Sequence, residues 1–186
     1  MYRVDGTSDL DEFDLPDWEG YAESSPVRIG NGAADQLQLD IYGEAVDAIY
    51  ELVKRGRSMY YDTWLGMVGI LDWLVDNWDR PDEGIWETRG GQKDFVYSRV
   101  MCWVAFDRAM RIASMKGLPA PLERWRKTRD RIYRQVMERG YNEEIGAFVQ
   151  YYGSDVLDAS LLKMPLVGFI APRDPRWVST LDAMNR

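Results

Sequence analysis

Apolar residues recur at every third or fourth position over most of the chain between residues 36 and 139. This spacing predicts helices, because it brings the apolar side chains to one helical face. The pattern is clearest in residues 59–78, and Pro81 then prevents the helix from continuing. Four helices of similar length are predicted, at residues 36–55, 59–78, 95–115 and 120–139.

The apolar faces of these helices differ in width. Residues 95–115 are apolar on most of their circumference, which is typical of a helix enclosed by neighbours. Residues 120–139 carry only a narrow apolar stripe, which indicates an outer layer. Shorter helices are predicted at 158–167, capped by Asp158, and from about residue 172 to the end. The pattern therefore predicts an all-α fold of helical hairpins in two layers, either an open arc or part of a closed α/α ring.

The remaining segments lack a sustained period. Residues 1–35 are rich in aspartate, glycine, serine and proline, which predicts loop structure. A short extended run is predicted at residues 147–152. A chain of 186 residues is by default one domain, long enough to bury a substantial core.

The amino-acid composition limits the partners and the catalytic groups that this chain can use. The net charge of −8 argues against nucleic acid or an anionic membrane as a partner, and favours a neutral ligand or another protein. The chain has no histidine, and its single cysteine, Cys102, lies in an apolar run typical of the core. Acid–base chemistry near neutral pH would therefore depend on carboxylates, and no metal or cofactor is predicted.

The connector at residues 78–95, WDRPDEGIWETRGGQKDF, places a tryptophan and a glutamate in a glycine-rich loop. A carboxyl group beside a large aromatic ring is harder to ionise, which suits a proton donor. Glu87 is thus a candidate general acid, and Arg89 is a candidate for orienting substrate hydroxyls. The alternative is a polar loop that Ile85 and Trp86 anchor to the core.

Two other stretches gather polar side chains. The first, PVRIGNGAADQLQLD at residues 26–40, offers donors and acceptors at a helix entrance, as sugar-binding sites do; its candidates are Arg28, Asn31, Gln36 and Asp40. The alternative there is ordinary capping and a solvated first turn. The second, GSDVLDASLL, contains Asp155 and Asp158, for which a helix N-cap is the favoured interpretation.

Taken together, the motifs PVRIGNGAADQLQLDIYGE, PDEGIWETRGGQKDFVYSRVMCWVAFDRA and YGSDVLDASLL resemble bacterial members of glycoside hydrolase family 15 in order and spacing. That family includes glucoamylase-like and trehalase-like enzymes, and the resemblance runs from about Tyr2 to Asn185. It implies part of an (α/α)6 toroid that hydrolyses α-glucosidic bonds with inversion. It also implies Glu87 as the general acid, Trp86 and Arg89 in the sugar subsite, and Arg28 with its neighbours near the substrate pocket. Thr88 departs from the second glutamate that fungal relatives often carry.

An inverting glycosidase needs a second carboxylate as general base. The resemblance implies that this base comes from a downstream motif outside these residues; internal candidates are Asp40, Glu44 and Asp158. We therefore expect residues 1–186 to be one segment of a catalytic domain that acts on an α-glucoside or oligosaccharide. On its own, this segment is expected to form an incomplete ring and to have no activity. The first residues show no signal-peptide pattern, and no apolar segment is long enough to span a bilayer. A cytoplasmic location is therefore expected. The competing interpretation is a non-catalytic helical module that binds glycan or protein.

Overall fold

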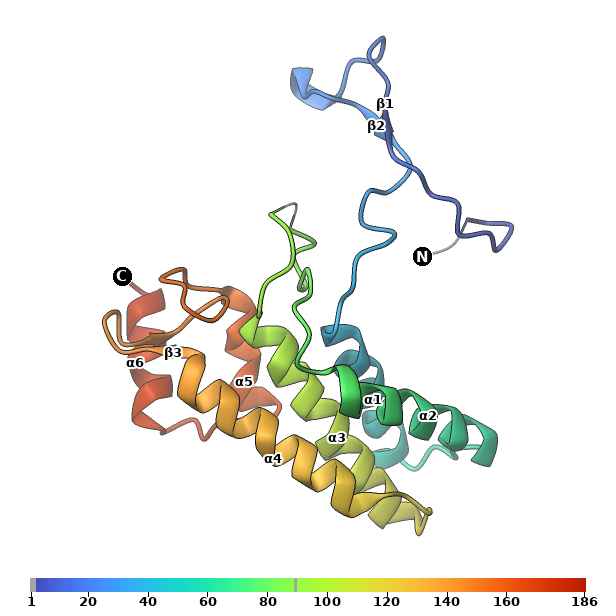
Figure 1. Ribbon diagram of the computed structural model, residues 1–186, viewed down its shortest axis with the longest axis vertical. Helices are drawn as coiled ribbons and strands as arrows, with labels where there is room; N and C mark the ends of the chain where they lie inside the picture. Colours follow the sequence, from blue (N-terminus) through green and yellow to red (C-terminus); the bar gives the residue numbers. More distant parts are fainter. Residues whose placement is uncertain (1–2, 89) are drawn as a thin grey trace. The chain divides into compact units, whose positions relative to one another are not determined.

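The computed structural model describes residues 3–88 and 90–186, which fall into two compact units divided between Leu37 and Gln38 (Figure 1). Arg89 lies outside the described residues. Helices dominate, and the prediction of an all-α chain is confirmed. The α-helices of the described residues are α1 Asp40–Lys54, α2 Tyr61–Asn77, α3 Val96–Lys116, α4 Leu122–Arg139, α5 Lys163–Leu166 and α6 Pro175–Met184.

The first unit is mostly irregular, as its composition predicts. Its regular structure among the described residues consists of two-residue strands, β1 Phe13–Asp14 and β2 Arg28–Ile29, and a 3₁₀ turn, η1 Tyr21–Glu23. The strands pair antiparallel, with Phe13 opposite Ile29 and Asp14 opposite Arg28. For residues 3–35, the described part of the predicted loop region, the loop prediction is thus confirmed apart from these short elements.

Helix α3 is at the centre of the second unit. It packs against α1 and α4 (Figure 1). Most of its side chains are buried, around the whole circumference of the helix. The prediction of an enclosed helix is therefore confirmed. The approach of α1 is very close at Gly43, where an added Cβ atom would lie 2.1 Å from the carbonyl oxygen of Met101. Glycine is required at this crossing, since a larger residue would push the two helices apart.

Helices α2 and α4 form a second layer. The buried stripe of α4 consists of Trp125, Thr128, Ile132 and Val136, which confirms the narrow apolar face that the sequence predicts. Trp64 of α2 packs edge-to-face on Trp125 with ring centroids 6.1 Å apart. The buried Trp64 indole also donates a hydrogen bond of 2.9 Å to the carbonyl oxygen of Pro119, so its polar atom is satisfied.

Most predicted helix ends lie within three residues of the observed ones, and two elements differ more clearly. Helix α1 begins at Asp40 and not at residue 36, because the preceding backbone amide, that of Leu39, donates to the Asp82 carboxylate at 3.0 Å. The predicted fifth helix is a 3₁₀ turn, η2 Ala159–Leu162, followed by the short α5, which contains Pro165. Asp158 caps η2 by accepting a 2.9 Å hydrogen bond from the Ser160 amide, as predicted.

The predicted extended run at residues 147–152 is also present in part. Strand β4, Ala147–Phe148, pairs antiparallel with β3, Tyr141–Asn142, and Tyr151 forms an isolated bridge with Phe95. The bridge joins this region to the start of α3. Among residues 3–88 and 90–186, none of the helices combines the length and the apolar composition that a membrane span requires.

Candidate active site

The loop from Asp82 to Phe95, called here the 82–95 loop, projects between α2 and α3 (Figure 1). Asp82 and Lys93 close it by exchanging backbone hydrogen bonds of 3.0 and 2.8 Å. Gly84 adopts a left-handed conformation with φ +67°, and a Cβ atom there would lie 2.9 Å from the Phe95 ring. Both the conformation and the close contact require glycine. The sequence motif is thus part of a closed, internally supported loop.

Glu87 is exposed on this loop. Its backbone has φ +48°, an unusual conformation for a residue other than glycine, which costs about 1 kcal/mol or more. The Glu87 amide donates to the Gly84 carbonyl oxygen at 3.2 Å, and its carboxylate accepts a 3.1 Å hydrogen bond from the Gln38 side-chain amide. None of the ion pairs among the described residues involves Glu87. The carboxyl group is therefore held in place and still accessible.

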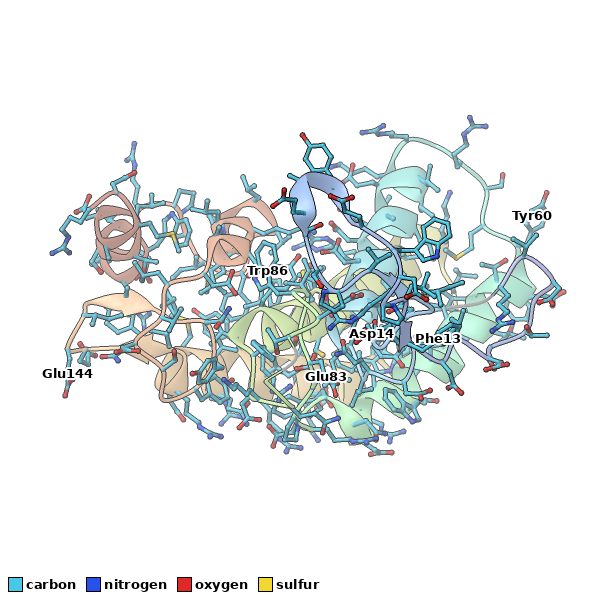
Figure 2. The ribbon with its side chains drawn as sticks, turned by 90° about the horizontal axis from the view of Figure 1, so that it is seen from above. Phe13, Asp14, Tyr60, Glu83, Trp86 and Glu144 are labelled. Atoms are coloured by element: carbon cyan, nitrogen blue, oxygen red, sulfur yellow. The ribbon has the colours of Figure 1, made fainter. Side chains whose placement is uncertain are left out.

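Trp86 is fixed by a residue that is distant in sequence. Its indole N–H donates to both carboxylate oxygens of Asp158, at 2.9 and 3.1 Å. The Trp86 residue, labelled in Figure 2, keeps 56% of its surface exposed. Asp158 is buried and also caps η2. The helix cap predicted for Asp158 is therefore only one of its two roles, because it also orients the tryptophan that precedes Glu87.

A second polar cluster joins α1, α3 and α5. Lys163 Nζ lies 2.7 Å from both carboxylate oxygens of Glu44, and the Tyr97 hydroxyl donates to the same carboxylate. Burial acts to raise the pKa of Glu44, but the hydrogen bonds from Lys163 and Tyr97 lower it overall. The pKa of Tyr97 is raised by burial, by its bond to Glu44 and by the charges of Asp40 and Asp158. Glu44 is thus held as a carboxylate.

Asp40 lies in the first turn of α1 and is only 4% exposed. Burial raises its pKa to about 6, and the negative charges of Asp82 and Glu44 add to the effect. Its Oδ1 atom has no hydrogen-bond partner among the described residues. Burial also raises the pKa of Asp82, although hydrogen bonds from Leu39 and Ser98 act in the opposite direction. The start of α1 is therefore a site where negative charge is costly.

Because ionisation of the buried Asp40 is unfavourable, we expect Asp40→Asn to stabilise the folded protein in a pH-dependent way. The pKa of Asp40 is 3.8 in an unfolded chain and about 6 in the folded protein. The wild-type protein therefore loses stability as the pH rises from 3.8 to about 6. The variant lacks this loss and should be more stable by about 1–3 kcal/mol above pH 6, with little difference below pH 4. Thermal melts from pH 4 to 8 measure it. Asp155→Asn, the same change at an exposed position, should leave the pH dependence unaltered; a similar effect in both variants contradicts the interpretation.

The other predicted site residues lie in the first unit or outside the described residues. Arg28 forms ion pairs with Asp14 at 3.0 Å and Glu12 at 3.5 Å. Asn31 accepts a 2.9 Å hydrogen bond from the Ala33 amide, and Gln36 is half-buried. Substrate binding by Arg28, Asn31, Gln36, Asp40 and the undescribed Arg89 stays a prediction.

Several residues of this site were not singled out by the sequence interpretation. Tyr97 and Lys163 become polar partners of Glu44 only through the fold, since Lys163 is 119 positions away from Glu44. The sequence around Asp82 gives a weak indication of local structure. Asp82 follows a proline and lies two positions before a glycine, a composition typical of a structured turn. That signal indicates a turn, and the buried contacts of the Asp82 side chain are visible only in three dimensions.

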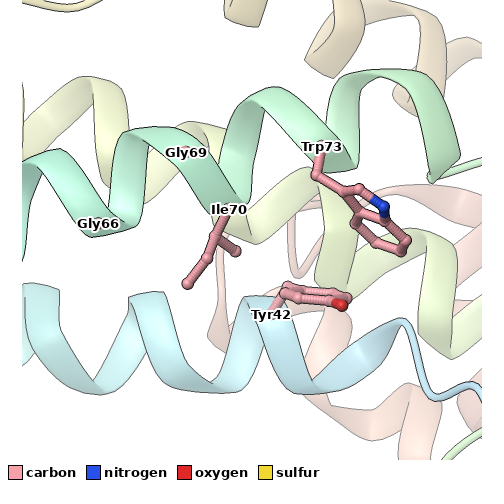
Figure 3. A pocket seen from close by; sticks show the side chains of 5 residues that line it. All are labelled: Tyr42, Gly66, Gly69, Ile70 and Trp73. Atoms are coloured by element: carbon pink, nitrogen blue, oxygen red, sulfur yellow. The ribbon is translucent and has the colours of Figure 1, made fainter.

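A separate groove of about 450 Å³ lies between α1 and α2 (Figure 3). The rings of Tyr42 and Trp73 contact each other there in a tilted arrangement, with centroids 5.3 Å apart, and Ile70 and two glycines complete the lining. The residues that line this groove include no carboxyl group to serve as the general acid. No group of three or more potential metal ligands occurs among residues 3–88 and 90–186. The 82–95 loop is therefore the candidate site for acid–base chemistry.

Similar proteins are known. The chain is 44% identical over 188 residues to a trehalase of Thermoplasma acidophilum, covering all of this chain and 32% of that protein. It is 41% identical over 186 residues to a trehalase of Thermoplasma volcanium, covering all of this chain and 30% of that protein. A trehalase of Mycobacterium tuberculosis is 39% identical over 184 residues, covering 99% and 27% of the two chains. The chain thus spans about a third of the length of these curated relatives.

Two solved glycosidase structures share the fold. One, in complex with glucose, has a TM-score of 0.67, and the other has 0.66; each is 22% identical and matches 80% of this chain and 39% of its own. The predicted architecture, helical hairpins forming part of an (α/α)6 toroid, is confirmed by this likeness. The sequence profile described as "Glycosyl hydrolases family 15" matches residues 1–186. The chain therefore belongs to the glycosyl hydrolases of family 15.

Proposed function

We propose that residues 1–186 are one segment of a catalytic domain that hydrolyses an α-glucosidic bond, with trehalose as the first substrate to test. The observation that carries the proposal is the match of the whole chain to family 15, in which trehalase relatives are about 40% identical. Glu87 lies in the motif that resembles the family's general-acid motif. Its carboxyl group is accessible on a loop with a defined conformation.

In the proposed reaction, Glu87 donates its proton to the bridging oxygen while the bond from that oxygen to the sugar's anomeric carbon breaks. A water molecule attacks the same carbon from the opposite face and loses its proton to a second carboxylate. Inverting glycosidases hold these two carboxyl groups about 6.5–9.5 Å apart to admit the water. We propose that this base comes from a part of the domain outside residues 1–186.

The surroundings of Glu87 suit a sugar ligand. The half-exposed Trp86 indole offers a flat apolar surface of the kind that packs on the C–H face of a pyranose. Its hydrogen bonds to Asp158 limit the rotation of that surface. Because Glu87 is exposed, we propose that further segments of the toroid supply the walls of the substrate cavity, in keeping with the one-third coverage of the relatives.

The test is hydrolysis by the complete polypeptide that carries these residues. Trehalose, maltose and isomaltose are supplied separately, and proton NMR follows the anomers of the released glucose. We expect hydrolysis of at least one substrate, trehalose first, with the attacked sugar appearing initially as the β-anomer. Cleavage of none of the three, or release of the attacked sugar as the α-anomer, contradicts the proposal. Residues 1–186 alone are expected to be inactive.

A further inference from the structure

The conformation of Glu87 depends on two neighbours. Its amide donates to the Gly84 carbonyl oxygen at 3.2 Å, and the Gln38 side chain donates to its carboxylate at 3.1 Å. The left-handed backbone of Glu87, with φ +48°, is intrinsically unfavourable and persists only where the surroundings determine it. The placement of the carboxyl group therefore depends on what fixes Gly84 and Gln38.

Asp82 contacts the chain next to both of these neighbours. Its side chain is fully buried, and Oδ2 accepts hydrogen bonds from the Leu39 amide at 3.0 Å and from the Ser98 hydroxyl at 2.7 Å. Leu39 directly follows Gln38 in the chain, so the first bond fixes the backbone that carries the Gln38 side chain. Gly84 lies two residues after Asp82, just inside the bridge that Asp82 forms with Lys93.

We propose that Asp82 is a positioning residue for the proton donor, because it anchors the two segments that contact Glu87. This inference rests on the proposed function of Glu87 as general acid. One carboxylate oxygen joins the start of the 82–95 loop to the beginning of α1 and, through Ser98, to α3. Displacing a reacting group by about 1 Å can lower a rate by about 100-fold. The buried carboxylate therefore acts on the rate through Glu87.

The loop should remain folded when this anchor is weakened. Arg99 of α3 is fully buried and donates to the Arg80 carbonyl oxygen at 2.9 Å and to the Asp94 carboxylate at 2.8 Å. These bonds hold both ends of the 82–95 loop independently of Asp82. Asp82→Asn keeps the size and one acceptor oxygen of the side chain but loses its charge, which weakens hydrogen bonds to the Leu39 amide and the Ser98 hydroxyl.

The experiment compares two leaving groups in the complete polypeptide. Trehalose needs a proton on its departing oxygen, whereas α-glucosyl fluoride releases fluoride with little help from an acid. Asp82→Asn is expected to lower kcat on trehalose by about 10- to 100-fold while KM changes little. Turnover of the fluoride should fall by no more than about threefold, since the same active site needs no placed proton donor for it. Equal losses on both substrates, or no loss on trehalose, overturn the inference.

Three further variants make the result specific. Ser98→Ala removes one hydrogen-bond donor to Asp82. It should lower kcat on trehalose relative to the fluoride by a factor about a third as large as in Asp82→Asn, or smaller. This variant tests the inference even if Asp82→Asn does not fold. Asp107→Asn changes another buried aspartate, one in the α3–α4 contact, and should leave the ratio of the two rates unchanged. Glu87→Gln tests the proposed function separately: if it does not lose trehalose hydrolysis selectively, Glu87 is not the acid. A selective loss in Glu87→Gln without one in Asp82→Asn or Ser98→Ala rejects only the role of Asp82.

Discussion

Glu87→Gln in the complete polypeptide is expected to lower kcat on the α-glucoside substrate by about 10²–10⁴-fold, the usual contribution of a positioned proton donor. Glutamine keeps the shape of the side chain and can still bond to Gln38 through its oxygen, but it has no proton to give to the leaving oxygen. KM should change little, because the lost interaction is made mainly in the transition state. Steady-state kinetics on trehalose measure the effect.

The matched control for this variant is Glu83→Gln. It makes the same chemical change four residues earlier in the same loop, at Glu83 (labelled in Figure 2). The Glu83 carboxylate accepts a 3.2 Å hydrogen bond from the Gln92 side chain. The glutamine oxygen can still accept this bond, and kcat should stay within about threefold of wild type. Near-normal activity in Glu87→Gln contradicts the assignment. Glycan binding that survives Glu87→Ala in a protein that hydrolyses none of the three disaccharides supports the non-catalytic module instead.

The helices of the second unit could be predicted from the sequence because each buries a face with a regular period. Helix α3 has no polar face to present to solvent and is enclosed, while α4 has a narrow stripe and is not. The start of α1 could not be predicted this way. It is set by the bond from the Leu39 amide to Asp82, whose position 43 residues downstream no local pattern reveals.

The candidate site, too, could be predicted from the sequence only in part. A short motif identified Trp86 and Glu87, because their chemistry is carried by adjacent residue types. The partner of Trp86, Asp158, lies 72 residues away in the chain, and the capping pattern that identified Asp158 explains only one of its bonds. Long-range hydrogen bonds of this kind arise from helix packing, and their partners need only be close in space.

The motif VAFDRA, which is part of the resemblance to the family, has a structural role in its second half. Arg108 is 8% exposed and donates to Asp47 of α1 at 2.7 Å, to Asp107 of α3 at 2.7 Å and to the Val167 carbonyl oxygen after α5 at 2.8 Å. Its guanidinium also lies 5.3 Å from the centre of the Tyr50 ring. One buried cation thus joins α1, α3 and the end of α5.

Arg108→Ala is therefore expected to reduce the free energy of unfolding by about 3–5 kcal/mol, because it leaves buried acceptors without their cation. Arg111→Ala is the matched control: Arg111 is in the same helix and donates to the same Asp107 at 2.7 Å, but its side chain is 55% exposed. Its loss should cost less than about 1 kcal/mol. Because both changes are arginine to alanine within α3, differences in helix propensity cancel. Denaturant unfolding followed by tryptophan fluorescence measures both variants, and equal losses would show that burial of the Arg108 network contributes nothing beyond a surface ion pair.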